Sequence, residues 1–175
     1  MNITLAQALP VRNSISRRIQ ELLRERSRVA FVEAEKGEQY EKPQRSIEEV
    51  TKELEETRAD YRTLDVLVSQ ENLRATVNWD GKEISLVEAI ELAKQIRGEV
   101  NVLKDFGNRQ KQERKSAQGW GGNSDANIIV HALYDPEQYR KAALKLEREV
   151  NRLSLEIDKK NHGVEFTFVN ADKYI

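Results

Sequence analysis

The sequence predicts a mainly α-helical protein, in which helical hairpins form a coiled-coil-like bundle with a short β-hairpin and short strand elements at one end. Apolar residues recur in steps of three and four over long stretches, as on amphipathic helices. Three stretches begin with Ser or Thr followed three residues later by Glu or Gln, which is typical of a capped helix start. Charged residues make up 34% of the chain and aromatic residues only 6%, which favours helices with one narrow apolar stripe. We expect one helical domain, residues 1–175.

The first helix is expected at about residues 4–32. Thr4 and Gln7 supply its capping box, and apolar residues then follow in steps of four and three. Pro10 lies too deep for the first turn, so we expect a kink or a separate one-turn start. A polar loop with a glycine and a proline follows at residues 33–45.

The second helix is expected at about residues 46–72. Ser46 and Glu49 form its capping box. Behind them the coiled-coil spacing of apolar residues continues without a break, so this helix is the clearest prediction in the chain.

A β-hairpin is expected at about residues 74–85, where the apolar period changes from helical to alternating. The Asp80-Gly81 pair between the alternating stretches is a strong signal for a tight turn. Ser85 then caps a third helix, expected at about residues 85–115.

The remaining elements are a loop, two strands and a fourth helix. The loop is rich in glycine and polar residues and contains a tryptophan; we call it the Gly/Trp loop (residues 116–125). A β-branched run predicts a strand at about residues 127–132, and alternating phenylalanines predict another at about residues 164–169. Between them, an Asp-Pro start predicts the fourth helix at about residues 135–161.

The composition excludes several classes of site. The net charge is −1, which argues against a surface for long nucleic acid or an anionic membrane. The chain has no cysteine and only two histidines, which excludes disulfides, thiol catalysis and a multi-histidine metal site. Neither a secretory signal nor a membrane span is recognised, so we expect a cytoplasmic protein, in its own cell or in an infected host cell.

Three segments carry a resemblance to known proteins. They are LAQAL (residues 5–9) with the arginine-rich helix after it, NLRATVNWDGKEISLVEAI (residues 72–90) and LEREVNRLSLEIDKKN (residues 146–161). Together they resemble the septicolysin-like family of small, little-characterised bacterial helical proteins, through most of the chain and in the same order. The resemblance implies a helical protein and assigns no catalytic residue. The chain departs from the family in QGWGGNSDAN (residues 118–127), so a shared ligand is not implied.

One segment combines glycines, a tryptophan and basic side chains. Glycines let backbone N–H groups approach an anion, cations neutralise it, and a tryptophan face stacks on a base. The glycine spacing is neither that of a Walker loop nor that of a dinucleotide fingerprint, so the alternative is a flexible loop after an exposed helix end. We expect a binding site for a nucleotide-type anion formed by Arg109, Lys111, Arg114, Lys115, Ser116, Gln118, Trp120, Asn123 and Ser124.

Three further residues are expected to contribute to this ligand site. Arg12 lies in the apolar register of the first helix, and arginine suits bidentate recognition of phosphate. Arg74 and Trp79 in the hairpin offer a cation and a stacking surface. The alternatives are structural: Arg12 pairs with glutamates of the second helix, and Trp79 anchors the hairpin on the bundle.

No catalytic residue, metal site or cofactor is expected. His131 has no identifiable nucleophile or carboxylate partner for general-base work. The run of glutamates near the start of the second helix lacks the Glu-x-x-His spacing of metal sites in helical bundles, and fits a solvated helix face.

These observations predict a non-enzymatic binding protein. We expect a homo-oligomer joined through its heptad-bearing helices, because the apolar stripes exceed what one thin core covers. It would hold a small anionic, nucleotide-type ligand, as do phage sponge proteins that sequester a host immune signal; this step is analogy. The alternative is a structural or protein-interaction coiled-coil protein without a small-molecule ligand.

Overall fold

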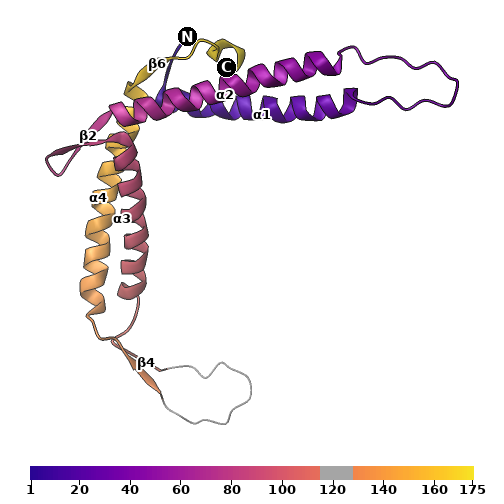
Figure 1. The fold of residues 1–175 in the computed structure, drawn as a ribbon. Coiled ribbons are helices and arrows are strands. Elements are labelled where there is room, and N and C mark those ends of the chain that lie inside the picture. Colours follow the sequence, from indigo (N-terminus) through magenta and orange to yellow (C-terminus); the bar gives the residue numbers. More distant parts are fainter. Residues whose placement is uncertain (115–127) are drawn as a thin grey trace, which may run out of the picture.

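The computed structural model describes residues 1–114 and 128–175, and it consists mainly of four helices in two hairpins. Helix α1 (Leu5–Val29) lies beside α2 (Ile47–Arg74), and α3 (Leu86–Gly107) lies beside α4 (Pro136–Gly163). The two hairpins form the arms of an L (Figure 1), which we name the α1–α2 arm and the α3–α4 arm. The place where the arms meet is called the corner. The mainly α-helical fold class with minor β structure is confirmed.

Helix α1 begins at its predicted capping box. The Thr4 hydroxyl accepts a hydrogen bond from the Gln7 backbone N–H at 3.1 Å, and Gln7 Oε1 accepts one from the Thr4 N–H at 2.9 Å. The helix continues without interruption through Pro10, so the separate one-turn start is wrong. Pro10 is exposed and lies near the helix start, where its missing N–H removes a single hydrogen bond of the ladder. Its end at Val29 precedes the predicted end by three residues.

Helix α2 begins as predicted, with Ser46 and Glu49 satisfying each other's backbone N–H groups at 3.2 and 2.8 Å. It packs on α1 through a small apolar cluster of Leu22, Val50 and Leu54, all fully buried. The polar stretch between the two helices forms an irregular connection, which confirms the predicted loop. The α1–α2 arm is therefore two helices thick along its length (Figure 1).

The predicted β-hairpin is confirmed at the corner. Strand β2 (Thr76–Trp79) pairs antiparallel with β3 (Lys82–Ser85). Asp80 and Gly81 both have positive φ, 49° and 76°, as a tight turn of type I′ requires. Ser85 then caps α3 by accepting a hydrogen bond from the Glu88 N–H at 3.2 Å.

Helix α3 ends at Gly107, so the predicted helix over 85–115 is wrong in its last two turns. Gly107 lies against α4: a Cβ at this position would stand 2.9 Å from Arg140 Cα. Arg140 Nη2 also donates to the Gly107 carbonyl at 2.9 Å, which fixes the end of the helix. Beyond it the chain forms strand β4 (Gln112–Arg114).

The predicted strand near residue 130 is confirmed as β5 (Ile129–His131), and its antiparallel partner is β4. This pair lies at the far end of the α3–α4 arm and not beside the β-hairpin (Figure 1). The expectation that the short strand elements lie at one end is thus wrong for β5, and its partner β4 was expected to be helical. The reason is that the end of α3 turns the chain back at the far end of the arm, where two extended segments meet.

The two ends of the described chain also pair. Asp135 and Pro136 start α4 as predicted, and the strand after it is β6 (Glu165–Thr167). Strand β6 pairs antiparallel with β1 (Asn2–Thr4), a strand that was not predicted from the sequence. A short 3-10 helix, η1 (Ala171–Lys173), follows and lies against the α1–α2 arm.

The main core lies at the corner, where all four helices, the β-hairpin and β6 contribute side chains. Residues of the predicted heptad stripes are buried there within one chain, including Leu64 of α2 and Leu153 of α4. Trp79 is partly buried on the same cluster. The apolar stripes are therefore largely covered by the protein itself, and the reason given for oligomerisation through them does not hold. No helix in the described ranges has the length and apolar character to cross a bilayer.

Candidate functional site

The twelve residues expected to bind the ligand do not form one site in the described part of the chain. Six of them, with the whole Gly/Trp loop, lie outside the described residues: Lys115, Ser116, Gln118, Trp120, Asn123 and Ser124. The other six lie at three places, namely α1, the corner and the far end of the α3–α4 arm: Arg12, Arg74, Trp79, Arg109, Lys111 and Arg114.

Arg12 contacts α2, as its structural alternative stated, although the carboxylate belongs to an aspartate. Its Nε lies 2.6 Å from Asp65 Oδ1, and its Nη2 donates to Asp65 Oδ2 at 3.3 Å. The guanidinium carbon lies 5.2 Å from the centre of the Tyr61 ring. The hydrogen bond to Asp65 is the main cause that raises the pKa of Arg12. Arg12 thus connects α1 to α2 within the chain.

Arg74 and Trp79 also have partners within the chain. Arg74, in the last turn of α2, is largely exposed and forms an ion pair with Glu71 at 3.0 Å. Trp79 packs on the core at the corner, which anchors β2 and β3. Neither residue lies at the far end of the α3–α4 arm (Figure 1), so the hairpin does not join the basic residues there.

The far end of the α3–α4 arm, residues 106–114 and 128–134, is named the distal tip. A hollow of about 440 Å³ lies there, lined by β5, the residues after it and the lead-in to β4. Its members are Arg109, Gln110, Glu113, Val130, His131, Ala132, Leu133 and Tyr134. Arg109, one of the predicted ligand residues, therefore lines a cavity.

Large apolar side chains are exposed at the distal tip. Leu133 is 99% exposed, and its neighbours Ile128, Ile129 and Val130 are about half exposed. At the adjoining ends of α3 and α4 there is a compact aromatic cluster, in which the ring centres of Phe106, Tyr134 and Tyr139 lie 4.9 to 5.5 Å apart. An exposed apolar surface of this kind is typical of an interaction site.

Two contacts hold the distal tip in shape. Tyr134 donates its hydroxyl to the Phe106 carbonyl at 3.2 Å, across the ends of α3 and α4. The Ala132 N–H donates to the Lys111 carbonyl at 3.0 Å, which extends the pairing of β4 with β5. The apolar side chains are thus presented from a hydrogen-bonded frame.

Basic side chains border this apolar surface. Arg109 pairs with Glu113 at 3.2 Å. Glu113 also accepts a hydrogen bond from the Gln110 N–H at 2.8 Å, which is the main cause that lowers the pKa of Glu113. Lys111 and Arg114 have no ion-pair partner among residues 1–114 and 128–175, so they leave positive charge beside the apolar centre.

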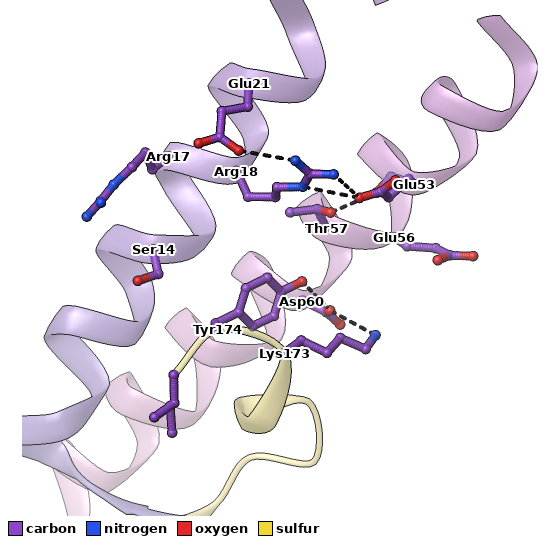
Figure 2. Close-up of a pocket in the computed structure, with 11 residues that line it drawn as sticks. Ser14, Arg17, Arg18, Glu21, Glu53, Glu56, Thr57, Asp60, Lys173 and Tyr174 are labelled. Carbon is purple, nitrogen blue, oxygen red and sulfur yellow. Dashed lines mark hydrogen bonds and ion pairs between the residues drawn. The ribbon is translucent and has the colours of Figure 1, made fainter. Parts of the chain in front are cut away.

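A second cavity, of about 510 Å³, lies between α1, α2 and the C-terminal segment (Figure 2). Its walls carry both signs of charge, and most of these groups are paired with one another. Arg18 Nη2 donates to Glu53 Oε1 at 2.6 Å, and Arg45 donates to the other oxygen of the same carboxylate. The hydrogen bond from Arg18 is the main cause that lowers the pKa of Glu53. Arg17 of α1 and Glu56 of α2 also line this cavity (Figure 2).

The floor of this cavity is the buried carboxylate of Asp60, which was not predicted from the sequence as a site residue. Asp60 Oδ2 accepts a hydrogen bond from the Tyr174 hydroxyl at 2.7 Å, and Oδ1 accepts one from Asn170 Nδ2 at 2.6 Å. Lys173 Nζ lies 3.6 Å from Oδ2. Asp60 therefore fixes the C-terminal segment on α2. Its partners lie more than a hundred residues away in the sequence, so no local pattern marks this contact.

No group of three or more His, Asp or Glu side chains is placed to hold a metal ion within the described residues. His131 is exposed on β5 at the edge of the hollow. The distal tip combines exposed apolar side chains with basic residues.

Comparison with known proteins identifies the fold but no activity. No protein-family model matches the sequence, and no curated protein matches it. A solved structure with the same fold is the crystal structure of a functionally unknown conserved protein from Corynebacterium diphtheriae. It is 23% identical, the match covers 95% of this chain and 100% of that one, and the TM-score is 0.61. At this identity the likeness shows the fold alone.

Proposed function

We propose that the protein is a non-enzymatic binding protein that contacts a partner protein through the distal tip of the α3–α4 arm. The observation that carries this proposal is Leu133, which is 99% exposed among half-exposed Ile128, Ile129 and Val130. Exposing several large apolar side chains together is costly in water, and covering them favours association.

The side chains at the distal tip indicate what kind of surface a partner protein would present. Apolar side chains at the centre of an interface supply most of the affinity, while charges at its rim set the orientation and the rate of encounter. Among residues 106–114 and 128–134, the rim carries Arg109, Lys111 and Arg114 against the single carboxylate of Glu113. The matching surface is apolar and bordered by carboxylates.

Site-specific photo-crosslinking tests this proposal. A benzoylphenylalanine replaces Leu133 in the full chain, which is expressed in the cell type that naturally contains it. The matched control carries the same group in place of Leu155, an exposed leucine of α4 outside the tip. We expect a crosslinked protein of defined mass from position 133 only.

The product from position 133 must also depend on the rim charges. Combining it with Lys111→Glu and Arg114→Glu is expected to reduce the yield about tenfold, because reversed charges repel a carboxylate-bordered surface. An absence of product, or equal products from positions 133 and 155, contradicts a role of the tip in binding.

A second candidate function is favoured by the hollow of about 440 Å³ beside these cations. Here the tip holds a small anionic, nucleotide-type ligand in the cytoplasm of the cell or of an infected host, as a sponge protein does. Arg109 and His131 line the hollow, and Lys111 and Arg114 lie on or beside β4. Cations beside an apolar wall suit a ligand with a phosphate and a base.

Thermal shift with a panel of nucleotides, including cyclic and ADP-ribose derivatives, tests the second candidate. A ligand at about a hundred times its Kd stabilises the folded state by about 2.7 kcal/mol and raises the melting temperature. Lys111→Ala with Arg114→Ala should abolish the shift, and the Lys52→Ala control on α2 should not. No shift with any nucleotide excludes these ligands and leaves the protein-contact function.

A further inference from the structure

The free end of the α1–α2 arm also exposes large apolar side chains. We name residues 31–42 the acidic end. Phe31 is 82% exposed and Tyr40 59% exposed, and Val32 is also exposed. This connection contains four glutamates and two lysines: Glu33, Glu35, Glu38, Glu41, Lys36 and Lys42.

The charged groups of the acidic end face solvent. Every residue from 31 to 42 is exposed, and none of the glutamates there forms an ion pair with any other described residue. A turn with the Glu38 N–H donating to the Glu35 carbonyl at 3.0 Å, next to Gly37 at φ +94°, folds the connection back. The acidic end is thus an apolar surface bordered by carboxylates.

The acidic end thus has the apolar centre and the carboxylate border that we propose for the partner of the distal tip. The tip offers Leu133 and its apolar neighbours with a basic rim, and the acidic end offers Phe31 and Tyr40 with an acidic rim. Opposite charges around apolar centres steer two surfaces together and exclude wrong partners. The match exists within one sequence.

The distal tip and the acidic end of one chain do not contact each other. The distal tip and the acidic end lie at the two free ends of the L (Figure 1), and the arms that carry them lead away from the corner in different directions. Each helical hairpin packs on the common core at the corner, which holds the arms apart. A contact between the two surfaces therefore joins two molecules.

We infer that the distal tip of one copy docks on the acidic end of a second copy. This inference rests on the proposed binding role of the tip and names its partner. Because the two surfaces differ, the contact is heterologous and repeats from copy to copy, giving a closed ring or an open chain. The oligomer expected from the sequence would then form through the arm ends and not through the heptad stripes.

A charge-exchange experiment on the purified full chain tests this inference by sedimentation velocity. Wild type is expected to form species larger than one chain at about 100 µM. The tip variant (Lys111→Glu with Arg114→Glu) and the end variant (Glu35→Lys with Glu38→Lys) should each weaken self-association about tenfold or more. Both pairs lie outside the helices, so circular dichroism should show unchanged helical content.

Mixing the two variants gives the decisive measurement. In the mixture, the glutamates of the variant tip meet the lysines of the variant end, and the original tip of the end variant meets the original end of the tip variant. Complexes that contain both variants should therefore return. The control pair, Lys52→Glu with Lys159→Glu, changes the charge equally on exposed positions of α2 and α4 and should self-associate as wild type does. Two further variants test the apolar centres of the contact and not the charges at its rim: Leu133→Asp and Phe31→Asp should each weaken association.

Three results overturn the inference: a monomeric wild type at that concentration, self-association unchanged by either reversal, or no complex in the mixture. If wild type is monomeric while position 133 crosslinks a different protein in cells, the binding role of the tip stands and the second copy falls. If position 133 also yields no specific product, both proposals fall.

Discussion

At the scale of single residues, Asp60 explains how the last residues of the chain are held. A buried carboxylate is stable only when hydrogen-bond donors surround it. Asn170, Lys173 and Tyr174 supply them from the C-terminal segment. Removing the carboxylate would take away the acceptor that the Tyr174 hydroxyl and the Asn170 amide share.

Tyr174 makes this contact dependent on pH. Burial, followed by the hydrogen bond to Asp60, raises the pKa of Tyr174 from 10.0 to about 12. A raised pKa in the folded state means that its stabilising effect is complete below about pH 10 and is lost as the pH rises towards 12. Tyr174→Phe removes this titration.

We therefore expect wild type to lose more stability than Tyr174→Phe between about pH 8 and about pH 11, measured by urea unfolding. Tyr40→Phe, at an exposed position, serves as the control and should follow wild type. An equal loss in wild type and Tyr174→Phe would show that Tyr174 ionises freely in the folded protein.

At the scale of helices and strands, the starts of the helices were predictable because their signals are local. Each capping box, Thr4 with Gln7 and Ser46 with Glu49, spans one helical turn. The hydrogen bonds in both are those that the capping-box pattern requires. The Asp-Gly turn is local in the same way. Short-range chemistry is sufficient at these positions.

The elements that were missed depend on distant partners. The end of α3 is set by Arg140 on α4, and β1 exists because residues 165–167 pair with it. Likewise, the basic residues near Arg109 were found from local composition, but their separation from Arg12 and Trp79 depends on how the two arms are joined. Such contacts have no signature within a short stretch of sequence.

The packing of α3 on α4 gives a prediction with a matched control. Gly107→Ala places a Cβ 2.9 Å from the backbone of Arg140, so it should cost about 1–3 kcal/mol of unfolding free energy. Gly98→Ala, in the same helix, meets nothing within 4 Å and should stabilise the protein by about 0.5–1 kcal/mol. Urea unfolding measures both. Equal effects of the two substitutions would mean that α4 does not approach Gly107 closely.

At the scale of the whole molecule, the L shape follows from where the apolar residues are buried. The corner gathers residues from all four helices, whereas the outer α1–α2 arm has only the small cluster around Leu54. Within each arm, the two helices bury their apolar stripes against each other and leave their charged faces in water. The protein is therefore extended, and its two free ends are its most prominent surfaces (Figure 1).

This shape is measurable by small-angle X-ray scattering. A compact domain of 175 residues has a radius of gyration of about 16 Å. An L of two helical arms places much of its mass far from the centre, so we expect a clearly larger value for the single chain. The tip variant, Lys111→Glu with Arg114→Glu, is the suitable sample, because association would enlarge the wild-type value for a different reason. A radius near 16 Å for that variant would mean that the arms fold onto each other, and the separation of the distal tip from the acidic end would then be lost.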